Sequence, residues 1–328
     1  MTATPLIEVR DLKVHFQVRT GALLARDAVL KAVDGVSFTL APGETLGVVG
    51  ESGCGKSTLG RAVLQLIPPT AGEVVWLGQP IQGLSTARMR PLRRDMQIVF
   101  QDPLAALNPR MTVGEIIGEP FDTFVPSLSK TERKARVREM MTKVGLSPQM
   151  VNRYPHEFSG GQCQRIGIAR AMILGPKLIV CDEPVSALDV SIQAQIVNLL
   201  MQLQREFNLS LILISHDLSV VRQISHRVMV LYLGRVMETA NRDELYARPR
   251  HPYTQALISA VPIPDPEREA NKPRMILTAD LPSPFEPPSG CLFRTRCPRA
   301  TALCAEAPPP EDRVSESHHV FCHHWRSG

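Results

Sequence analysis

The sequence has no long hydrophobic run and little excess of charge of either sign. No apolar stretch approaches the ~18 residues that span a bilayer, which excludes an integral membrane protein. The 37 Lys and Arg against 32 Asp and Glu leave a net charge of +5, too small to predict nucleic-acid binding and equally suited to an anionic membrane surface. The start carries Glu8, Arg10 and Asp11 where a signal peptide needs uninterrupted apolar residues. We therefore expect the chain to stay in the cytosol.

The chain has few cysteines, and their number is odd. The chain has seven cysteines, and in a reducing compartment they are not expected to form a disulfide framework. With 44% apolar and 21% charged residues the composition is that of an ordinary globular protein, so disordered, collagen-like and disulfide-rich classes are excluded. At ~150 residues per domain, 328 residues predict two domains, or one large domain with an appendage.

Proline divides the chain. Half of the 28 prolines lie between Pro249 and Pro310. Because proline fixes φ and removes a backbone donor, helices and central strands cannot run through this stretch. We predict a compact domain over residues 1–260 and an irregular Pro-rich extension over residues 261–328, called the extension below. The extension also holds four of the seven cysteines.

Short continuous apolar runs predict buried strands at residues 45–49, 97–100, 178–181 and 209–214. Such runs are typical of a parallel sheet covered by helices on both faces. Ahead of them, Val36, Phe38 and Leu40 alternate with polar residues, as in a half-exposed antiparallel strand. The fold class expected is α/β, with a small β region before the core.

Residues 112–146 are predicted to be helical, within an insertion spanning about residues 102–162. Ser129 and Glu132 form a capping box that starts a helix. One apolar stripe follows, made of Val137, Met140, Met141 and Val144.

Residues 50–57, called the phosphate loop below, match the pattern G-x-x-x-x-G-K-[ST] between a predicted strand and a helix predicted at 58–66. Glycines let backbone N–H groups turn inward around an anion, and the helix start adds partial positive charge. Lys56 can reach the β and γ phosphates, and the Ser57 hydroxyl can ligate Mg²⁺. The alternative, a glycine-rich turn that matches by chance, is disfavoured by the flanking elements. The residues expected to bind ATP here are Gly50, Ser52, Gly53, Cys54, Gly55, Lys56, Ser57 and Thr58.

Two acids, Asp182 and Glu183, follow the apolar strand at 178–181. Ligands bind at the carboxyl ends of parallel strands, so both acids are expected to face the phosphate site. Asp182 would hold Mg²⁺ directly or through a water, and Glu183 would polarise the attacking water. The alternative is two solvated acids after a buried strand, and the phosphate loop favours the Mg²⁺ interpretation.

Residues 158–162 narrow the class of nucleotide-binding protein, because kinases, GTPases, helicases and transporters share both the phosphate loop and the pair of acids. They precede a helix predicted at 164–174 and would present backbone donors at its start. A chain that already cradles the γ-phosphate does not need a second anion site, so these donors are expected to serve a nucleotide on another subunit. A helix cap with a flexible approach is the alternative. The residues of this signature segment are Ser159, Gly160, Gly161 and Gln162.

With this signature segment the sequence resembles the ATP-binding-cassette family. The resemblance implies a P-loop NTPase with a RecA-like core, an N-terminal antiparallel β region and a helical subdomain. Gln101 resembles the family's Q-loop glutamine, which touches Mg²⁺ and couples to the membrane partner. His216 resembles the switch histidine at the γ-phosphate, and Asp189 lies in a segment similar to the D-loop. Phe16 resembles an adenine-stacking aromatic, although many such positions are simply core.

Two residues depart from the family pattern. Phe158 stands where leucine is usual, a tolerable apolar exchange. Cys163 stands where a basic residue usually follows the glutamine, and its presence is expected to weaken a contact to phosphate or to a neighbouring acid. Neither departure touches the catalytic residues.

Nearly the whole chain resembles the ATP-binding subunits of dipeptide and oligopeptide (peptide/nickel) importers, specifically the second of their two ATPases. Residues 53–61, 101–103, 107–110, 251–254 and the cysteine-bearing tail carry the resemblance. It implies ATP- and Mg²⁺-dependent import of di- or oligopeptides from a peripheral position at the cytoplasmic face of the cell membrane. The implied partners are a second cassette ATPase, two membrane permease subunits and, indirectly, a solute-binding protein. Nickel, glutathione and antimicrobial peptides are alternative cargoes.

The main rival is a soluble cassette ATPase acting on nucleic acid or ribosomes. Such relatives usually join two cassettes or carry a long helical insertion, and this chain has one set of motifs. No aromatic residues interleave with the basic residues at 88–94 or 130–138, as stacking on single strands requires. The run at 130–138 is better explained as the solvated face of a helix, and no nucleic-acid partner is expected.

Four cysteines of the extension are separated by gaps of 5, 6 and 17 residues. Structural zinc sites favour gaps of about two to four residues, whereas iron–sulfur clusters tolerate looser spacing. Similar tails in peptide-importer ATPases imply a 4Fe–4S cluster. Zinc is the less favoured alternative, kept open by neighbouring histidines, and unliganded thiols are the third. The cysteines are Cys291, Cys297, Cys304 and Cys322, and the histidines are His318, His319, His323 and His324.

Overall fold

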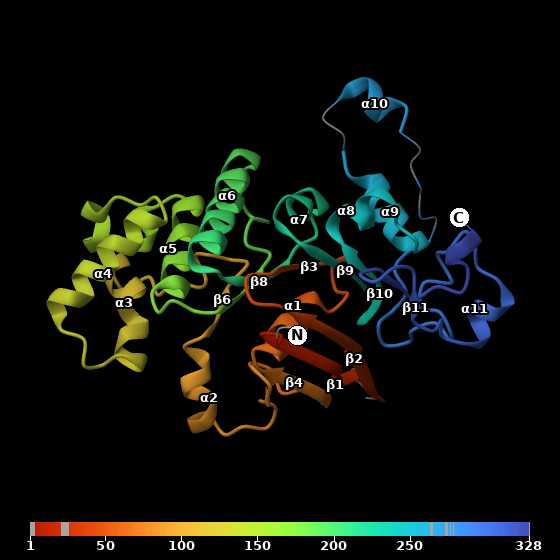
Figure 1. Cartoon of the computed structure of the whole chain (residues 1–328), viewed down its shortest axis with the longest axis horizontal. Coiled ribbons are helices and arrows are strands. Elements are labelled where there is room, and N and C mark those ends of the chain that lie inside the picture. The colour runs from red at the N-terminus through yellow and green to blue at the C-terminus, as the bar shows by residue number, and fades with distance from the viewer. Residues whose placement is uncertain are drawn as a thin grey trace. The chain divides into compact units, whose positions relative to one another are not determined.

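The computed structural model describes residues 4–20, 26–262, 265–272, 275, 277 and 279–327 (Figure 1). The chain divides into two compact units. The described residues of the first unit lie in 40–45 and 83–215, and those of the second in 4–39, 46–82 and 216–327. The predicted boundary at residue 260 lies within the second unit and stays a prediction about sequence domains.

The first unit has a parallel sheet and a group of helices. Its elements are α2 (Thr86–Arg93), β6 (Met96–Val99), α3 (Val113–Phe124), α4 (Lys130–Lys143), η1 (Pro148–Asn152), η2 (Pro155–Glu157), α5 (Gly160–Met172), β7 (Leu178–Asp182), α6 (Val190–Phe207) and β8 (Ser210–Ile214). Strand β7 lies between β6 and β8 and is parallel to both, with Val180 opposite Ile98 and Ile212. Every residue of β7 and β8 is buried, as the continuous apolar runs predicted.

The predicted helical stretch is two helices, because the residue before a proline is restricted and helices tend to end there. Helix α3 ends at Phe124, its C-cap is Val125, and Pro126 follows. Helix α4 begins after Ser129, whose side chain completes the predicted capping box with Glu132. The predicted apolar stripe of α4 and the turn that follows it is buried, and α3 packs against both α4 and α5.

The second unit contains two groups of strands. Its elements are β1 (Ile7–Thr20), β2 (Arg26–Leu40), β3 (Thr45–Val49), α1 (Lys56–Val63), β4 (Ala71–Trp76), β5 (Gln79–Pro80), α7 (Leu218–Ile224), β9 (Arg227–Tyr232), β10 (Arg235–Asn241), α8 (Arg242–Ala247), α9 (Pro252–Ala260), α10 (Pro266–Ala270), α11 (Ala302–Glu306), β11 (Asp312–Arg313), β12 (His319–Val320) and η3 (Trp325–Ser327). One sheet has the order β2-β1-β4-β5, and its β1–β4 and β4–β5 pairs are antiparallel.

The second group of strands combines parallel and antiparallel pairs. Strand β3 is parallel to β9, β9 is antiparallel to β10, and the short strands β12 and β11 continue the antiparallel order. The last two strands come from the extension, which lies beside β10 in Figure 1. The alternation predicted in β2 is present, because Val36, Phe38 and Leu40 are buried while their neighbours are exposed.

An aromatic cluster joins the extension to the rest of the second unit. The ring of Phe293 is fully buried. Its centroid lies 5.4 Å from that of Tyr232 on β9 and 5.3 Å from that of Tyr253 on α9. Such ring pairs stabilise a fold beyond the area they bury. The extension is therefore packed into the second unit through this cluster.

Within the described part of the chain, no helix is both long enough and apolar enough to cross a membrane.

Candidate functional site

The phosphate loop joins β3 to α1 in the second unit. Gly55 has φ of 102°, and a Cβ at this position would overlap the carbonyl oxygen of Ala32, so only glycine fits. No side chain caps the start of α1. The buried Lys56 ammonium donates to the carbonyl oxygens of Gly50 and Glu51 at 2.8 and 2.9 Å. The loop thus folds around its own lysine.

The other residues of the loop differ in exposure. Ser52 and Gly53 are exposed, and Ser57 and Thr58 are half-buried. Cys54 is buried, and burial raises the pKa of its thiol despite the nearby Lys56 ammonium. A buried neutral thiol behaves as a small apolar residue, which argues against a redox role for Cys54.

The two acids lie at the end of β7 in the first unit. Asp182 is only 2% exposed, and Glu183 is half-buried. Glu183 has φ of 47°, a left-handed conformation that costs a non-glycine residue about 1–2 kcal/mol. Its Oε2 accepts a hydrogen bond from Gln101 Nε2 at 3.1 Å. The structure therefore brings the predicted Q-loop residue and the predicted base together, and it places strain at the base, as functional sites often do.

The signature segment forms the start of α5. Ser159 Oγ accepts from the backbone N–H of Gln162, and Gln162 Oε1 accepts from that of Ser159, which closes a capping box. A Cβ on Gly161 would overlap Ile192 of α6, whereas one on Gly160 would meet Leu188 at an ordinary 3.5 Å. The glycine at 161 is thus required by packing within this unit, while Gly160 is exposed.

The two departures from the family pattern differ in exposure. Phe158 is half-buried. Cys163 is fully buried, and its Sγ donates to the carbonyl oxygen of Pro155 at 3.5 Å. Because the thiol faces the interior, Cys163 is a packing residue in this structure rather than a surface contact.

Three predicted residues lie away from the contacts described above. His216 is exposed and Phe16 of β1 is half-buried. Asp189 is the exposed N-cap residue of α6. Their roles toward a nucleotide stay predictions. The phosphate loop, Phe16 and His216 belong to the second unit, and the acids, Gln101, Asp189 and the signature segment belong to the first.

The four cysteines of the extension gather in the second unit. Cys291, Cys304 and Cys322 are buried and Cys297 is half-buried. Burial raises the pKa of Cys291 to about 11, and it also raises the pKa values of Cys297 and Cys322. Among the residues that the structure describes, no group of three or more His, Cys, Asp or Glu is arranged to hold a metal ion. The expectation of an iron–sulfur or zinc site is therefore not supported by this structure.

The four histidines considered as possible zinc ligands have other partners. His318 Nε2 lies 2.7 Å from Glu238 Oε1, and His319 Nδ1 lies 2.8 Å from Glu311. His323 bonds to the carbonyl oxygen of Ala307 at 3.0 Å, and His324 bonds to the hydroxyl of Thr301 at 2.8 Å.

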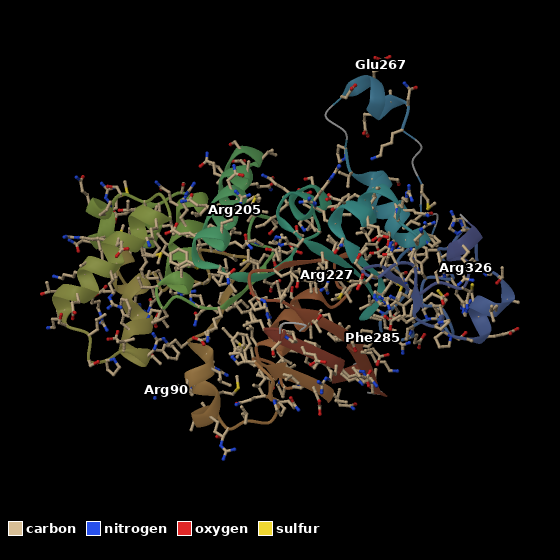
Figure 2. The ribbon with its side chains drawn as sticks, viewed as in Figure 1. Arg90, Arg205, Arg227, Glu267, Phe285 and Arg326 are labelled. Atoms are coloured by element: carbon tan, nitrogen blue, oxygen red, sulfur yellow. The ribbon has the colours of Figure 1, made fainter. Side chains whose placement is uncertain are left out.

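The basic run at 130–138 is a surface feature, as expected, and the run at 88–94 is largely exposed as well. Most of residues 130–138 are exposed on α4, and Arg133 pairs with Asp122 at 2.6 Å. Arg90 projects from α2 (Figure 2), and its Nη2 donates to the carbonyl oxygen of Thr123 at 2.9 Å.

Sequence reasoning missed three residues around the phosphate loop. Glu51 occupies a position that the pattern leaves open, and Tyr253 belongs to a segment that served only as a family marker. Tyr253 Oη accepts from the backbone N–H of Glu51 at 2.9 Å, and Arg296 pairs with the Glu51 carboxylate. No local pattern points to Arg296, because it lies 245 residues from its partner.

Two family models match the chain. The model described as "ABC transporter" matches residues 33–186, and the model described as "Oligopeptide/dipeptide transporter, C-terminal region" matches residues 237–304. The oligopeptide transport ATP-binding protein OppF of Escherichia coli K12 is 60% identical over 319 residues, which are 97% of this chain and 95% of that protein. The oligopeptide transport ATP-binding protein AppF of Bacillus subtilis 168 is 54% identical over 97% of each chain.

Solved structures of cassette proteins share the fold. The dimeric post-hydrolysis structure of the ATP-binding cassette MJ0796, bound to ADP and Pi, aligns with a TM-score of 0.64 and 28% identity, over 72% of this chain and 98% of that chain. The cbiO1 protein of Clostridium perfringens aligns with a TM-score of 0.64 and 26% identity, over 75% and 92%. Taken with the phosphate loop, the acids and the signature segment, these likenesses establish that the chain belongs to the ATP-binding-cassette transporter family, as an ATPase that carries the oligopeptide and dipeptide transporter C-terminal region.

Proposed function

We propose that this chain hydrolyses ATP to energise the import of oligopeptides across the cytoplasmic membrane. The observation that carries the proposal is 60% identity over 97% of the chain to an oligopeptide transport ATP-binding protein. The similarity continues into the extension, because the oligopeptide/dipeptide transporter C-terminal region matches residues 237–304. Both parts of the chain therefore support one role. Nickel, glutathione and antimicrobial peptides are the alternative cargoes, and the names of the relatives favour peptides.

The phosphate loop is proposed to bind ATP. Its backbone N–H groups and the start of α1 suit the phosphates, and Lys56 is already held over the loop by two carbonyl oxygens. Phe16 is proposed to stack on the adenine. The signature segment is proposed to bind the ATP of the second subunit.

Mg²⁺ is proposed to be held by the Ser57 hydroxyl, the Asp182 carboxylate and the Gln101 amide. Hydroxyl, carboxylate and amide oxygens are the hard ligands that this ion prefers, so the donor set fits. When bound, the ion neutralises charge on the β and γ phosphates.

Glu183 is proposed to position and polarise the attacking water. Gln101 Nε2 donates to Glu183 Oε2, so the amide orients the carboxylate from one side. His216 is proposed to contact the γ-phosphate, and Asp189 to act at the contact between subunits. Catalysis by these groups consists of positioning and charge stabilisation, as expected for phosphoryl transfer.

The proposed assembly pairs two ATPase subunits head to tail, with the phosphate loop of one facing the signature segment of the other. A solved cassette relative, bound to ADP and Pi, is described as dimeric, which supports a dimer here. The partner is proposed to be a distinct second ATPase. Two permease subunits would hold the pair at the cytoplasmic face of the membrane, docked near Gln101, and a solute-binding protein would deliver cargo.

Co-purification of the tagged chain from its native membranes tests this assembly. Two multi-span membrane proteins and a second cassette ATPase in the eluate would support it. Reconstituted vesicles should then accumulate a labelled tetrapeptide when ATP is supplied with the solute-binding protein, and Glu183→Gln should abolish the uptake. Recovery only from the soluble fraction with nucleic acid or ribosomes would overturn the transport role.

Iron–sulfur ligation by the four cysteines is a separate proposal, supported by chemistry rather than by a formed metal geometry. Cys291, Cys297 and Cys322 each accept a backbone hydrogen bond from the residue two positions on, and such bonds stabilise thiolates. Burial and the neighbouring cysteines nevertheless raise the pKa of each of these thiols. Anaerobically purified protein should contain iron and absorb broadly near ~400 nm. Colourless protein with stoichiometric zinc would contradict the cluster.

A further inference from the structure

A carboxylate stands inside the phosphate loop, and the extension neutralises it. Glu51 is the second residue of the loop. Its Oε2 and Oε1 accept from Nη1 and Nη2 of Arg296 at 2.6 and 3.0 Å, a two-point ion pair. The Arg296 side chain is only 8% exposed. Two-point pairs between arginine and a carboxylate are among the stronger hydrogen-bonded contacts in proteins, because their geometry is fixed and both groups are charged.

Two further contacts hold Arg296 in place, one within the extension and one with β9. Arg296 Nε donates to the carbonyl oxygen of Ala279 at 2.9 Å, and the guanidinium carbon lies 5.9 Å from the centroid of the Tyr232 ring. Phe293, three residues earlier, is buried against Tyr232 and Tyr253. One short segment of the extension therefore supplies both an aromatic anchor and the cation.

Glu51 is also held through its backbone. Its N–H donates to Tyr253 Oη at 2.9 Å, and its carbonyl oxygen accepts from Lys56 Nζ at 2.9 Å. A continuous set of contacts thus runs from Arg296 through Glu51 to the lysine of the phosphate loop. We therefore expect a substitution of Arg296 to alter the position of Lys56.

The charge of Glu51 opposes the task of the loop. A loop that binds phosphates is built to attract anions, and an unpaired carboxylate within it would repel them. We propose that Arg296 is a positioning residue of the ATP site, which neutralises Glu51 and holds the phosphate loop in its binding conformation. The proposal rests on the assignment of residues 50–58 as the ATP loop. It makes the extension a structural part of nucleotide binding in the same chain.

Calorimetric titration of the purified full-length chain with ATP and Mg²⁺ tests the proposal. Arg296→Ala should raise the Kd for ATP about tenfold, since it leaves a carboxylate unpaired near the phosphates. The double variant Glu51→Gln/Arg296→Ala should recover most of the affinity, because no charge is then left to repel the ligand. A purely structural role for Arg296 would give no such recovery. Arg299→Ala is the matched control, because Arg299 lies in the same segment but bonds to Gln255 at 3.1 Å, and it should bind ATP like the unsubstituted chain.

Two results would overturn the proposal. One is an unchanged Kd in Arg296→Ala, and the other is a double variant that binds as weakly as the single one. Should Arg296→Ala fail to fold, Arg296→Gln takes its place, since glutamine keeps a hydrogen-bond donor but removes the charge. A weakened affinity in Arg296→Gln that Glu51→Gln relieves supports the proposal, and wild-type affinity in Arg296→Gln contradicts it. Lys56→Ala distinguishes failure of this proposal from failure of the proposed function. ATP binding unaffected by Lys56→Ala would contradict the assignment of residues 50–58 as the ATP loop.

Discussion

Two helix starts of this protein, those of α1 and α5, are built in opposite ways. Helix α1 follows Gly55 and has no side-chain cap, whereas α5 begins at Ser159 with a closed capping box. A glycine start leaves the first backbone donors to a ligand, while a capped start satisfies one of them within the chain. The Ser159 hydroxyl accepts in its cap and still has a proton to donate. The difference suits the roles proposed above, in which the phosphate loop binds ATP of its own chain and the signature segment contacts ATP of a second subunit.

The largest expected effect separates ATP binding by the phosphate loop from hydrolysis by Glu183. Glu183→Gln removes the proposed base but keeps its size and the possibility of bonding to Gln101. The rate of ATP hydrolysis by the assembled transporter, measured as phosphate release, should fall roughly 10²- to 10⁴-fold. The Kd for ATP should stay the same within experimental error. Glu157→Gln, at an exposed residue of η2, is the control and should hydrolyse normally. Near-normal turnover in Glu183→Gln would remove Glu183 as the base.

The response to acid should also distinguish the units, because His156 is the only one of the nine histidines in the first unit. Burial lowers the pKa of His251 from 6.5 to about 4. Since the folded pKa lies below the unfolded one, this histidine stabilises the fold above pH ~6.5, and that contribution, roughly 3 kcal/mol, is lost as the pH falls toward 4. Urea unfolding between pH 7 and pH ~4 measures the loss.

His251→Asn is the matched variant for the acid response. The His251 side chain caps α9 by accepting from the backbone N–H of Tyr253, and asparagine can also cap. The variant should therefore lose much of the acid dependence and little of the stability. His318 works in the opposite direction. Burial lowers its pKa, but bonds to Glu238 and Glu244 outweigh this and raise the pKa, so its contribution fades as the pH rises through the folded pKa. Acid dependence unchanged in His251→Asn would contradict the assignment.

A smaller effect tests why the signature segment contains glycine. Gly161→Ala would place a Cβ against Ile192, and overpacking of this kind costs about 1–3 kcal/mol of unfolding free energy. Gly160→Ala meets only an ordinary contact with Leu188 and should leave stability nearly unchanged. Thermal unfolding of both variants measures this difference. Equal stability of the two would show that α5 and α6 do not constrain residue 161.

The smallest effect concerns the cap of α5. Ser159→Ala should cost about 1 kcal/mol of unfolding free energy, because the backbone N–H of Gln162 loses its acceptor. Ser159→Asn keeps an acceptor and is expected to retain most of the stability. A loss of hydrolysis in Ser159→Asn at normal stability would show that the hydroxyl itself acts on the nucleotide. Stability of Ser159→Ala equal to that of the unsubstituted chain would contradict the cap.

Local patterns predicted local structure well. The buried strands β3, β6, β7 and β8 were expected within one residue of their bounds, and the capping box of α4 was expected at its own residues. Continuous apolar runs and caps depend only on neighbours in the chain, which explains this success. The break between α3 and α4 was missed although Pro126 signals it. The cysteine pattern predicted a metal site that the described residues do not form.

Contacts between residues distant in the sequence could not be predicted from local patterns. Nothing near Glu183 in the chain announces its left-handed backbone or its bond to Gln101, 82 residues away. The need for glycine at 161 depends on Ile192, a residue of the next helix along the chain. Each of these facts depends on which elements become neighbours in space, and spacing along the chain does not report it.

The sequence by itself determined the family, the phosphate loop, the acids and the signature segment. A phosphate-binding loop needs particular residues at fixed short spacing, and it folds locally between a strand and a helix. Only the tertiary structure decided how those groups are held. It paired Gln101 with Glu183 in one unit, and in the other it brought Arg296 and Tyr253 of the C-terminal part to Glu51. An ion pair between residues 245 positions apart depends on the packing that holds the two segments together, here the contacts among the buried aromatic rings.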